Sequence, residues 1–284
     1  MKQTAKLLVS CNDRKGLVAH ISDFIYRNGG NILDFDHHTD LEAGVFLARI
    51  EWELKDFQIP SSQIAAAFSG LASDFQIRYQ VFLGDQVPKI AIYVSKLPHC
   101  LVDLILRNQA GEFKANIALI LSNHTDVEEI ARSFGIPFMH FPITPQNKAL
   151  QEEAQIREIL HREVELIVLA RYMQILSERF VSTFPNRIIN IHHSFLPAFI
   201  GAAPYHQAFA RGVKLIGATG HYVTTALDNG PIIEQETARV SHRDSVEDLI
   251  RKGRDLEKSV LARAVRLHLL RKVLTYGNRT VVFD

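Results

Sequence analysis

Polar side chains that are able to do chemistry gather in two short segments of the sequence. Asn190-Ile191-His192-His193-Ser194 comes directly after a predicted buried strand, and His221, Thr224 and Asp228 follow the next pair of strands. An asparagine amide can donate to a developing oxyanion, a histidine can supply a proton, and a carboxylate can orient water or accept its proton. Because ligands of open α/β sheets bind beyond the carboxyl ends of the strands, these segments predict a catalytic site at one sheet edge.

Simpler interpretations of the same residues stay open. Asn190 could cap a turn, Asp228 could hold a loop, and one of the two adjacent histidines could be a packed structural residue. A zinc site would draw on His192, His193, His206 and His221. These histidines match none of the standard ligand spacings, so no metal site is expected. Ser194 lies outside any GxSxG motif, which leaves serine-hydrolase chemistry without support.

Composition limits the class of protein. The 284 residues are 47% hydrophobic and 22% charged, with a formal net charge of +1, which excludes disordered and fibrous proteins. Near-neutral charge disfavours nucleic-acid binding, no apolar stretch approaches the roughly 18 residues of a membrane span, and the first residues lack the features of a signal peptide. With Cys11 and Cys100 as its only cysteines, the sequence predicts a cytoplasmic protein without a disulfide framework.

The first part of the chain predicts a small α+β domain. Apolar runs and alternations indicate strands near residues 7–9, 31–38, 45–52 and 75–81, and helical spacing indicates helices near 17–25 and 60–71. The resulting β-α-β-β-α-β order is the ferredoxin-like arrangement.

The turn-rich segment 84–88 predicts a linker to a second domain. Beyond it, buried runs at 90–94, 117–121, 137–141, 166–170 and 188–191 alternate with helical patterns at 100–108, 127–134, 148–161 and 178–184. Continuous Ile, Val and Leu runs between helices predict a Rossmann-like α/β domain with a mostly parallel sheet. Residues 245–274 predict a long amphipathic helix. We therefore expect domains at 1–84 and 89–284.

The polar segments also resemble a known family. Asn190-Ile191-His192, the loop 194–201 and Leu227-Asp228-Asn229-Gly230-Pro231 are similar to the formyltransferase family that uses 10-formyltetrahydrofolate. The resemblance implies that Asn190, His192 and Asp228 are catalytic, and that residues 170–177 form a loop whose backbone holds the pterin. The other residues that it places at the substrate are Arg171, Met173, Gln174, Leu176, His193, Ser194, Gly201, His221 and Thr224.

Within that family the sequence is closer to the deformylase branch. His193 stands where transformylases generally carry proline, and Pro204-Tyr205-His206-Gln207-Ala208 and Gly277-Asn278-Arg279-Thr280 are similar to deformylase segments. The resemblance runs from about residue 7 to residue 283. It implies hydrolysis of 10-formyltetrahydrofolate to tetrahydrofolate and formate, with no tightly bound cofactor. Such a reaction would balance one-carbon pools and supply formate for purine synthesis.

The N-terminal domain resembles the ACT regulatory module, which deformylases carry and transformylases lack. The similarity rests on Asp13-Arg14-Lys15-Gly16 and Gly29-Gly30-Asn31-Ile32. It implies a homo-oligomer, a dimer or a tetramer, formed by side-by-side pairing of the small sheets. It also implies an effector site at Asn12, Asp13 and Gly16 with Asn31 nearby, for which glycine or methionine is the expected ligand. A module that only dimerises is the alternative.

The implied mechanism assigns Asn190 and protonated His192 to the oxyanion, and Asp228 to the activation of water. Two alternatives remain. A formyltransferase acting on a phosphorylated amine would need a phosphate cradle, and Ser95-Lys96-Leu97-Pro98-His99-Cys100 lacks a glycine-rich nest. An amino-acid-sensing regulator with an inactive catalytic domain is disfavoured because all three catalytic residue types are present.

Overall fold

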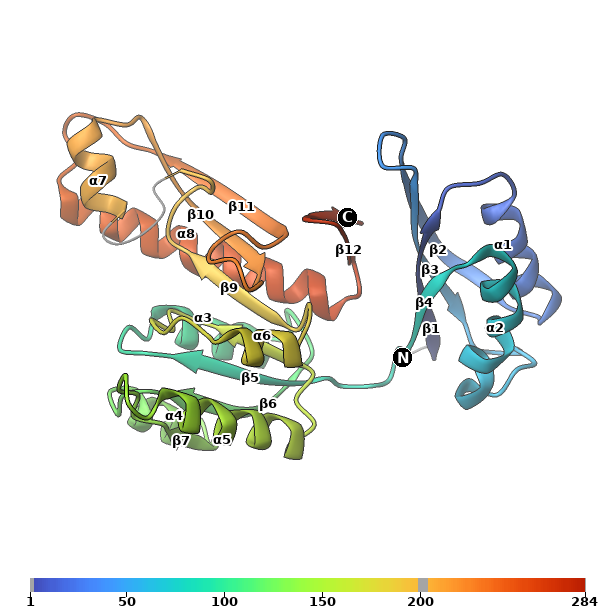
Figure 1. Cartoon of the computed structure of the whole chain (residues 1–284), viewed down its shortest axis with the longest axis horizontal. Coiled ribbons are helices and arrows are strands. Elements are labelled where there is room, and N and C mark those ends of the chain that lie inside the picture. The colour runs from blue at the N-terminus through green and yellow to red at the C-terminus, as the bar shows by residue number, and fades with distance from the viewer. Residues whose placement is uncertain (1–2, 199–203, 284) are drawn as a thin grey trace. The chain divides into compact units, whose positions relative to one another are not determined.

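Figure 1 shows the computed structural model of the chain, in which residues 3–198 and 204–283 are described. The chain divides into two compact units. One contains the described residues up to Gln86 together with Arg271–Tyr276 and those from Val281 onward, and the other contains Val87–Leu270 and Gly277–Thr280. The division after Gln86 falls inside the segment 84–88 where the sequence predicts a linker. Arg271–Tyr276, by contrast, groups with the first unit although the sequence assigns it to the second domain.

The first unit is a four-stranded antiparallel sheet with two helices. Its strands lie in the order β2-β3-β1-β4. Fully buried side chains such as Trp52 and Phe68 lie in its core. The elements are β1 (Thr4–Asn12), α1 (Leu17–Arg27), β2 (Asn31–Asp40), β3 (Val45–Glu53), the 3₁₀ helix η1 (Ser61–Gln63), α2 (Ile64–Phe75) and β4 (Arg78–Leu83).

The sequence explains where α1 begins and ends. Gly16 precedes the helix with φ of +93°, a left-handed conformation that glycine adopts without a steric penalty. Leu17, Ile21 and Ile25 then repeat at helical spacing and are buried. The helix ends at Arg27, and Gly29 follows in the left-handed region with φ of +76°.

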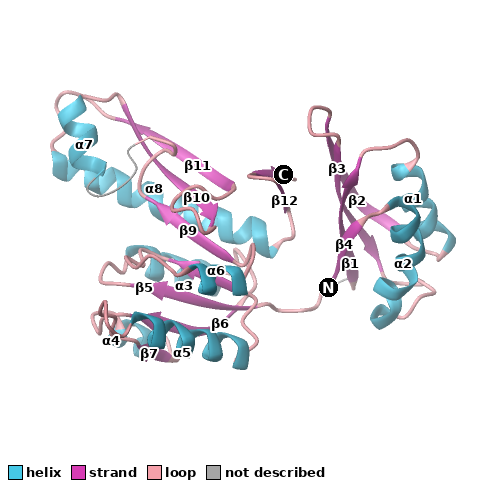
Figure 2. Ribbon diagram, in the orientation of Figure 1, coloured by secondary structure: helices cyan, strands magenta, loops and turns pink. Residues whose placement is uncertain are grey.

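The second unit is built on a seven-stranded sheet in the order β11-β10-β9-β8-β5-β6-β7. Figure 2 shows these strands in magenta between the helices of this unit. The strands are β5 (Lys89–Val94), β6 (Asn116–Ser122), β7 (Phe138–His140), β8 (Leu166–Leu169), β9 (Ile188–His192), β10 (Leu215–Tyr222) and β11 (Ile232–Arg239). The helices are α3 (His99–Gln109), α4 (Glu128–Ser133), α5 (Lys148–His161), α6 (Glu178–Thr183), α7 (Pro204–Arg211) and α8 (Val246–Leu269).

The central strands β9, β8, β5, β6 and β7 are parallel, and their buried side chains contribute to the core of this unit. Tyr93 of β5 packs in one core with Ile159 of α5 and Phe180 of α6. Helix α8 contacts β9, β10, β11, α3 and α7. Strand β10 runs antiparallel to both β9 and β11. The prediction of a mixed α/β fold with a mostly parallel sheet is therefore confirmed.

Two predicted boundaries are wrong. The alternation from Phe75 suggests a strand, but Phe75 is the last residue of α2, Gln76 is left-handed with φ of +54°, and β4 begins only at Arg78. Helix α8 ends at Leu269 rather than near residue 274, because Arg271 has φ of +60° and a short strand, β12 (Val273–Tyr276), follows. β12 pairs with β13 (Arg279–Val282).

No helix among the described residues is long and apolar enough to span a membrane.

Candidate active site

A cavity of about 600 Å³ lies in the second unit and brings together the polar residues of both sequence segments. Asn190 and His192 belong to strand β9, and His221 belongs to β10. The sequence predicts that these residues follow the strands, whereas the structure places Asn190 and His192 within β9 and His221 within β10. Because β10 is antiparallel to β9, the chain must fold back after Tyr222 before Asp228 can approach His192.

Asn190 and His221 face each other across the antiparallel pair of β9 and β10. His221 Nδ1 lies 2.9 Å from the backbone carbonyl oxygen of Tyr222, which can only accept, so this nitrogen carries the proton. His221 Nε2 is then the acceptor for the Asn190 amide at 3.2 Å. Burial lowers the pKa of His221, in agreement with a neutral ring. The contact therefore fixes the direction of the Asn190 amide group.

His192 is paired with Asp228. Its Nδ1 lies 3.3 Å from Asp228 Oδ2, while its buried Nε2 has no hydrogen-bond partner among the described residues. The hydrogen bond from His192 lowers the pKa of Asp228, which keeps the carboxylate ionised. Asp228 has φ of +50°, a left-handed conformation that aspartate tolerates better than most side chains. A histidine with a carboxylate on one nitrogen and a free second nitrogen is suited to proton transfer or oxyanion binding.

His193 is neutral and lies beside the catalytic candidates. Its ring centroid is 5.2 Å from that of His192 and 6.0 Å from that of Tyr205. Burial, reinforced by the charge of Arg171, lowers the pKa of His193 to about 4. At neutral pH this ring can therefore accept or donate a hydrogen bond but carries no charge.

The predicted folate loop, residues 170–177, is held by hydrogen bonds from other segments. Ser95 Oγ accepts the backbone N–H of Met173 at 2.9 Å and donates to Asn123 Oδ1 at 2.7 Å. At the end of the loop, Ser177 accepts from the N–H of Phe180 and so caps α6. Met173 and Ile175 remain 60% and 61% exposed, so the loop offers an apolar surface on which a ring could pack.

A buried carboxylate forms a second polar wall of the same cavity. Glu257 of α8 is 1% exposed and accepts from Tyr205 Oη at 2.6 Å and from His99 Nε2 at 2.8 Å. The Arg171 guanidinium lies 3.5 Å from the oxygen that His99 contacts. Burial by itself would raise the pKa of Glu257, but the hydrogen bond from His99 and the charge of Arg171 outweigh it and leave the pKa lowered. Glu257 is therefore an ionised group inside the cavity wall.

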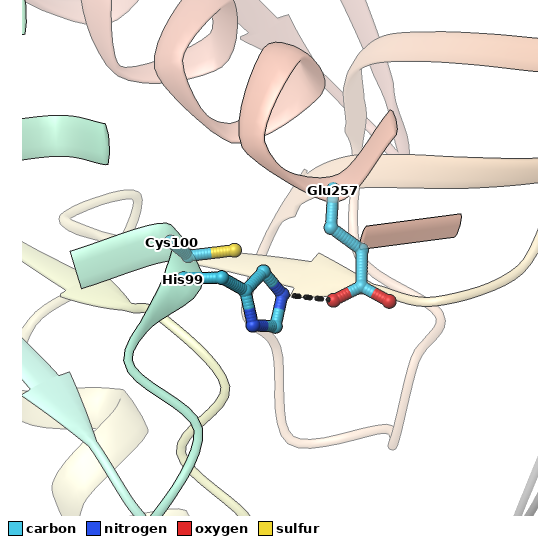
Figure 3. A group of neighbouring side chains, drawn as sticks. All are labelled: His99, Cys100 and Glu257. Atoms are coloured by element: carbon cyan, nitrogen blue, oxygen red, sulfur yellow. Dashed lines mark hydrogen bonds and ion pairs between the residues drawn. The ribbon is translucent and has the colours of Figure 1, made fainter. Parts of the chain in front are cut away.

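The same place holds the one cluster of possible metal ligands among the described residues. Figure 3 shows His99 turned toward Glu257 with Cys100 alongside, and their ligand atoms lie within 4.8 Å of one another. Burial raises the pKa of the Cys100 thiol well above its usual value, which opposes the thiolate that a metal requires. The Arg171 cation beside Glu257 also repels a divalent ion. We interpret the cluster as a hydrogen-bonded network.

Most residues predicted at the substrate line the large cavity, and among the described ones Ser194 is the exception. Ser194 lines a separate cavity of about 240 Å³, and its hydroxyl donates to the carbonyl oxygen of Ala198 at 2.6 Å. Gly201 lies outside the described residues. The predicted residues that line the large cavity are Asn190, His192, Asp228, Arg171, Met173, Gln174, Leu176, His193, His221 and Thr224.

His99 and Glu257 also line the cavity and are absent from the predicted set. A sequence signal for Glu257 exists, because the glutamate interrupts the buried stripe of α8 one residue after Leu256 and three before Val260. An acidic residue in a buried helix face needs a partner. No comparable signal marks His99.

The residues predicted to bind an effector do not all meet. Asp13 and Gly16 line a cavity of about 450 Å³ in the first unit, together with His37 and Phe46. Asn12 pairs with Val45 at one end of β3, whereas Asn31 pairs with Glu53 at the other end. Because β2 runs antiparallel to β3, Asn31 begins that strand far from the loop that Asn12 opens, and the expectation that it lies nearby is corrected.

Comparison with known proteins gives a consistent result. A family model described as "Formyl transferase" matches residues 88–265. A formyltetrahydrofolate deformylase of Synechocystis sp. is 56% identical over 280 residues, 99% of this chain and 98% of that protein. The crystal structure of a formyltetrahydrofolate deformylase from Pseudomonas syringae matches with a TM-score of 0.98 and 43% identity, over 100% of this chain and 95% of the other. A glycinamide ribonucleotide transformylase from Symbiobacterium toebii matches with a TM-score of 0.67 and 30% identity, over 72% of this chain and 97% of its own.

Proposed function

The chain belongs to the formyl transferase family and, within it, to the formyltetrahydrofolate deformylases, and from that premise we propose that it hydrolyses 10-formyltetrahydrofolate to tetrahydrofolate and formate. The observation that carries the proposal is the meeting of Asn190, His192 and Asp228 in one cavity, with each polar group held in a defined direction. A formamide carbonyl is a poor electrophile, so its attack by water requires oxyanion stabilisation and a proton acceptor.

In this mechanism the oxyanion is bound by the Asn190 amide and by His192. The Asn190 amide is oriented by His221 at 3.2 Å, and one of its two N–H groups remains for the substrate. His192 presents Nε2 while Nδ1 is held by Asp228. The negative charge of Asp228 stabilises the imidazolium that results when His192 is protonated.

Asp228 also accepts the proton of the attacking water. Its Oδ2 lies beside His192, and its Oδ1 lies 3.8 Å from His221 Nε2, which is an acceptor in the tautomer assigned above and so does not occupy that oxygen. The water oxygen forms a bond to the formyl carbon, the bond from that carbon to N10 breaks, and N10 takes up a proton. Formate leaves, and one proton is released to solvent.

The direct test is formate release from 10-formyltetrahydrofolate by the purified full chain with no amine added. Formate and tetrahydrofolate in equal amounts are expected. Absence of both products in a folded preparation would refute the proposal. The two alternative functions, transfer to an amine and a regulator without activity, are not favoured by the comparisons, since the relatives that match over nearly the whole chain carry the deformylase name.

The first unit supports a proposed regulatory and oligomerising role as an ACT-like domain. Its β2 is an edge strand of ten residues, and an edge of that length favours pairing with a second copy, in a dimer or a tetramer. The cavity at Asp13 and Gly16 is the proposed effector site, with glycine or methionine as ligand. Calorimetric titration with a panel of amino acids tests the effector, and a module that only dimerises would bind none of them.

We place the reaction in the cytoplasm, where it would balance one-carbon pools and supply formate for purine synthesis. Both cysteines, Cys11 and Cys100, are free and buried, as suits a reducing compartment. Loss of the gene product is expected to raise the demand for an external formate source. Growth with and without added formate measures this dependence.

A further inference from the structure

The cavity wall formed by His99, Tyr205 and Glu257, here called the glutamate wall, has no part in the proposed chemistry. Its residues come from three elements, α3, α7 and α8, and all three side chains line the cavity that holds the catalytic candidates. His193 connects the two sides, because its ring centroid is 5.2 Å from that of His192 and 6.0 Å from that of Tyr205. The glutamate wall is therefore close enough to influence what approaches the formyl carbon.

Among the described residues that line the cavity, Asp228 and Glu257 are the two carboxylates. An amine that attacks the formyl carbon donates hydrogen bonds through its N–H groups, so its binding site requires acceptors, and carboxylates are the strongest ones. Asp228 is engaged with His192. Glu257 has Tyr205 on Oε1 and His99 on Oε2, with Arg171 near the latter oxygen. Both oxygens of Glu257 thus already have side-chain partners, and the carboxylate oxygen that stays open is Asp228 Oδ1, which the proposed mechanism assigns to the attacking water.

Tyr205 also fills space at this wall. It is 8% exposed, and its hydroxyl reaches Glu257 by passing over Gly253 of α8. A Cβ at residue 253 would lie 2.1 Å from the Tyr205 ring, so the absence of a side chain there is what lets the tyrosine come this close. The close packing on Gly253 and the hydrogen bond to Glu257 hold the ring in place, so that it fills volume next to His193.

We infer that Tyr205 and Glu257 determine the nucleophile: the tyrosine engages the carboxylate and fills the acceptor space, so that water and not an amine reaches the formyl group. This inference rests on the proposed function. The competing reaction differs in one reactant only. An amine nitrogen would bond to the formyl carbon, the bond to N10 would break, and the proton lost by the amine would go to N10, which gives a formamide and tetrahydrofolate.

The test measures the ratio of formylated amine to formate. The full chain is incubated with 10-formyltetrahydrofolate and millimolar glycinamide at about pH 8, where about half of an α-amino group is neutral. Formate is assayed enzymatically and N-formylglycinamide by mass spectrometry. Because both products come from the same active molecules, the ratio does not depend on the fraction of a variant that folds.

For the unchanged chain, formate in large excess over N-formylglycinamide is expected, and this small ratio is the reference. Tyr205→Ala frees one Glu257 oxygen and opens the space, so the ratio should rise at least about tenfold, the lower end of what a shape change in a pocket produces. Tyr205→Phe frees the oxygen without opening the space and should give a smaller rise. Phe209→Ala is the matched control, because Phe209 lies one turn further along α7, is 49% exposed and does not line the cavity. Its ratio should equal that of the unchanged chain.

An unchanged ratio in Tyr205→Ala would overturn the inference, and so would loss of both products from a folded Tyr205→Ala variant, since the tyrosine would then belong to the chemistry itself. Should the alanine variant fail to fold, Tyr205→Phe decides, and an unchanged ratio there overturns the inference. If the unchanged chain releases no formate at all, the proposed function fails instead, so the two failures are distinguishable.

Discussion

The side chains of Asn190 and His221 are cross-strand neighbours in β9 and β10, and the asparagine amide donates to His221 Nε2 at 3.2 Å. His221 is 2% exposed and its other nitrogen donates to the carbonyl oxygen of Tyr222, so the ring cannot rotate without losing a buried hydrogen bond. We therefore propose that His221 acts through Asn190 as a positioning residue, and that Asn190 is the group that touches the substrate.

Replacing His221 by phenylalanine should lower kcat about tenfold or more with little change in KM, because the oxyanion donor stays present but loses its direction. Removal of the donor itself in Asn190→Ala should cost about 10²–10³ in kcat. Steady-state formate release measures both. In the double variant the losses should not multiply, since the two residues act as one unit. Fully multiplicative losses would show that His221 works independently of Asn190.

Asp228→Asn should lower kcat by about two to four orders of magnitude, because the amide can neither accept the water proton nor stabilise a charged His192. The fold should persist, since asparagine tolerates the left-handed backbone that Asp228 adopts at φ of +50°. Binding of tetrahydrofolate, measured by calorimetry, should be nearly unchanged. A variant that retained most of its turnover would exclude Asp228 as the proton acceptor.

The sequence predicts the catalytic side of the cavity better than the glutamate wall, for a physical reason. Asn190 and His192 lie where a buried strand ends, and local hydrophobic pattern is enough to place strand ends at a ligand-binding edge. Glu257 reaches the cavity only because α8 packs against α3 and α7, and such contacts depend on side-chain packing between distant segments. The antiparallel direction of β10, which brings His221 opposite Asn190, is likewise absent from any local pattern.

The low pKa of His193 predicts a stability loss in mild acid. In the folded chain the pKa is lowered from 6.5 to about 4, so below pH 6.5 the unfolded state binds more protons than the folded state. The stabilisation is complete when the pH is above the pKa of His193 in the unfolded state. It is lost as the pH falls toward the pKa of the folded state, by on the order of 3 kcal/mol in total.

Urea unfolding of the chain and of His193→Asn measures this loss of stability, at neutral pH and at a pH near the folded-state pKa of about 4. The variant has no titrating ring at this position. The unchanged chain should therefore lose stability relative to the variant as the pH falls. A difference that stays constant across this range would mean that His193 is protonated in the folded state at mildly acidic pH.

Loss of the Glu257 side chain should destabilise the second unit strongly. Glu257→Ala leaves the donors of His99 and Tyr205 and the charge of Arg171 without their acceptor in a buried place, at a cost of about 3–5 kcal/mol. Glu257→Gln keeps one carbonyl oxygen and the shape of the side chain, so its free energy of unfolding should fall by about 1–3 kcal/mol.

Glu128→Ala is the control, because Glu128 is 46% exposed in its pair with Arg132 and its loss should change stability by less than about 0.5 kcal/mol. Urea midpoints report all three changes. An alanine variant as stable as the control would mean that the three neighbours find other partners, and that the glutamate wall does not depend on its carboxylate.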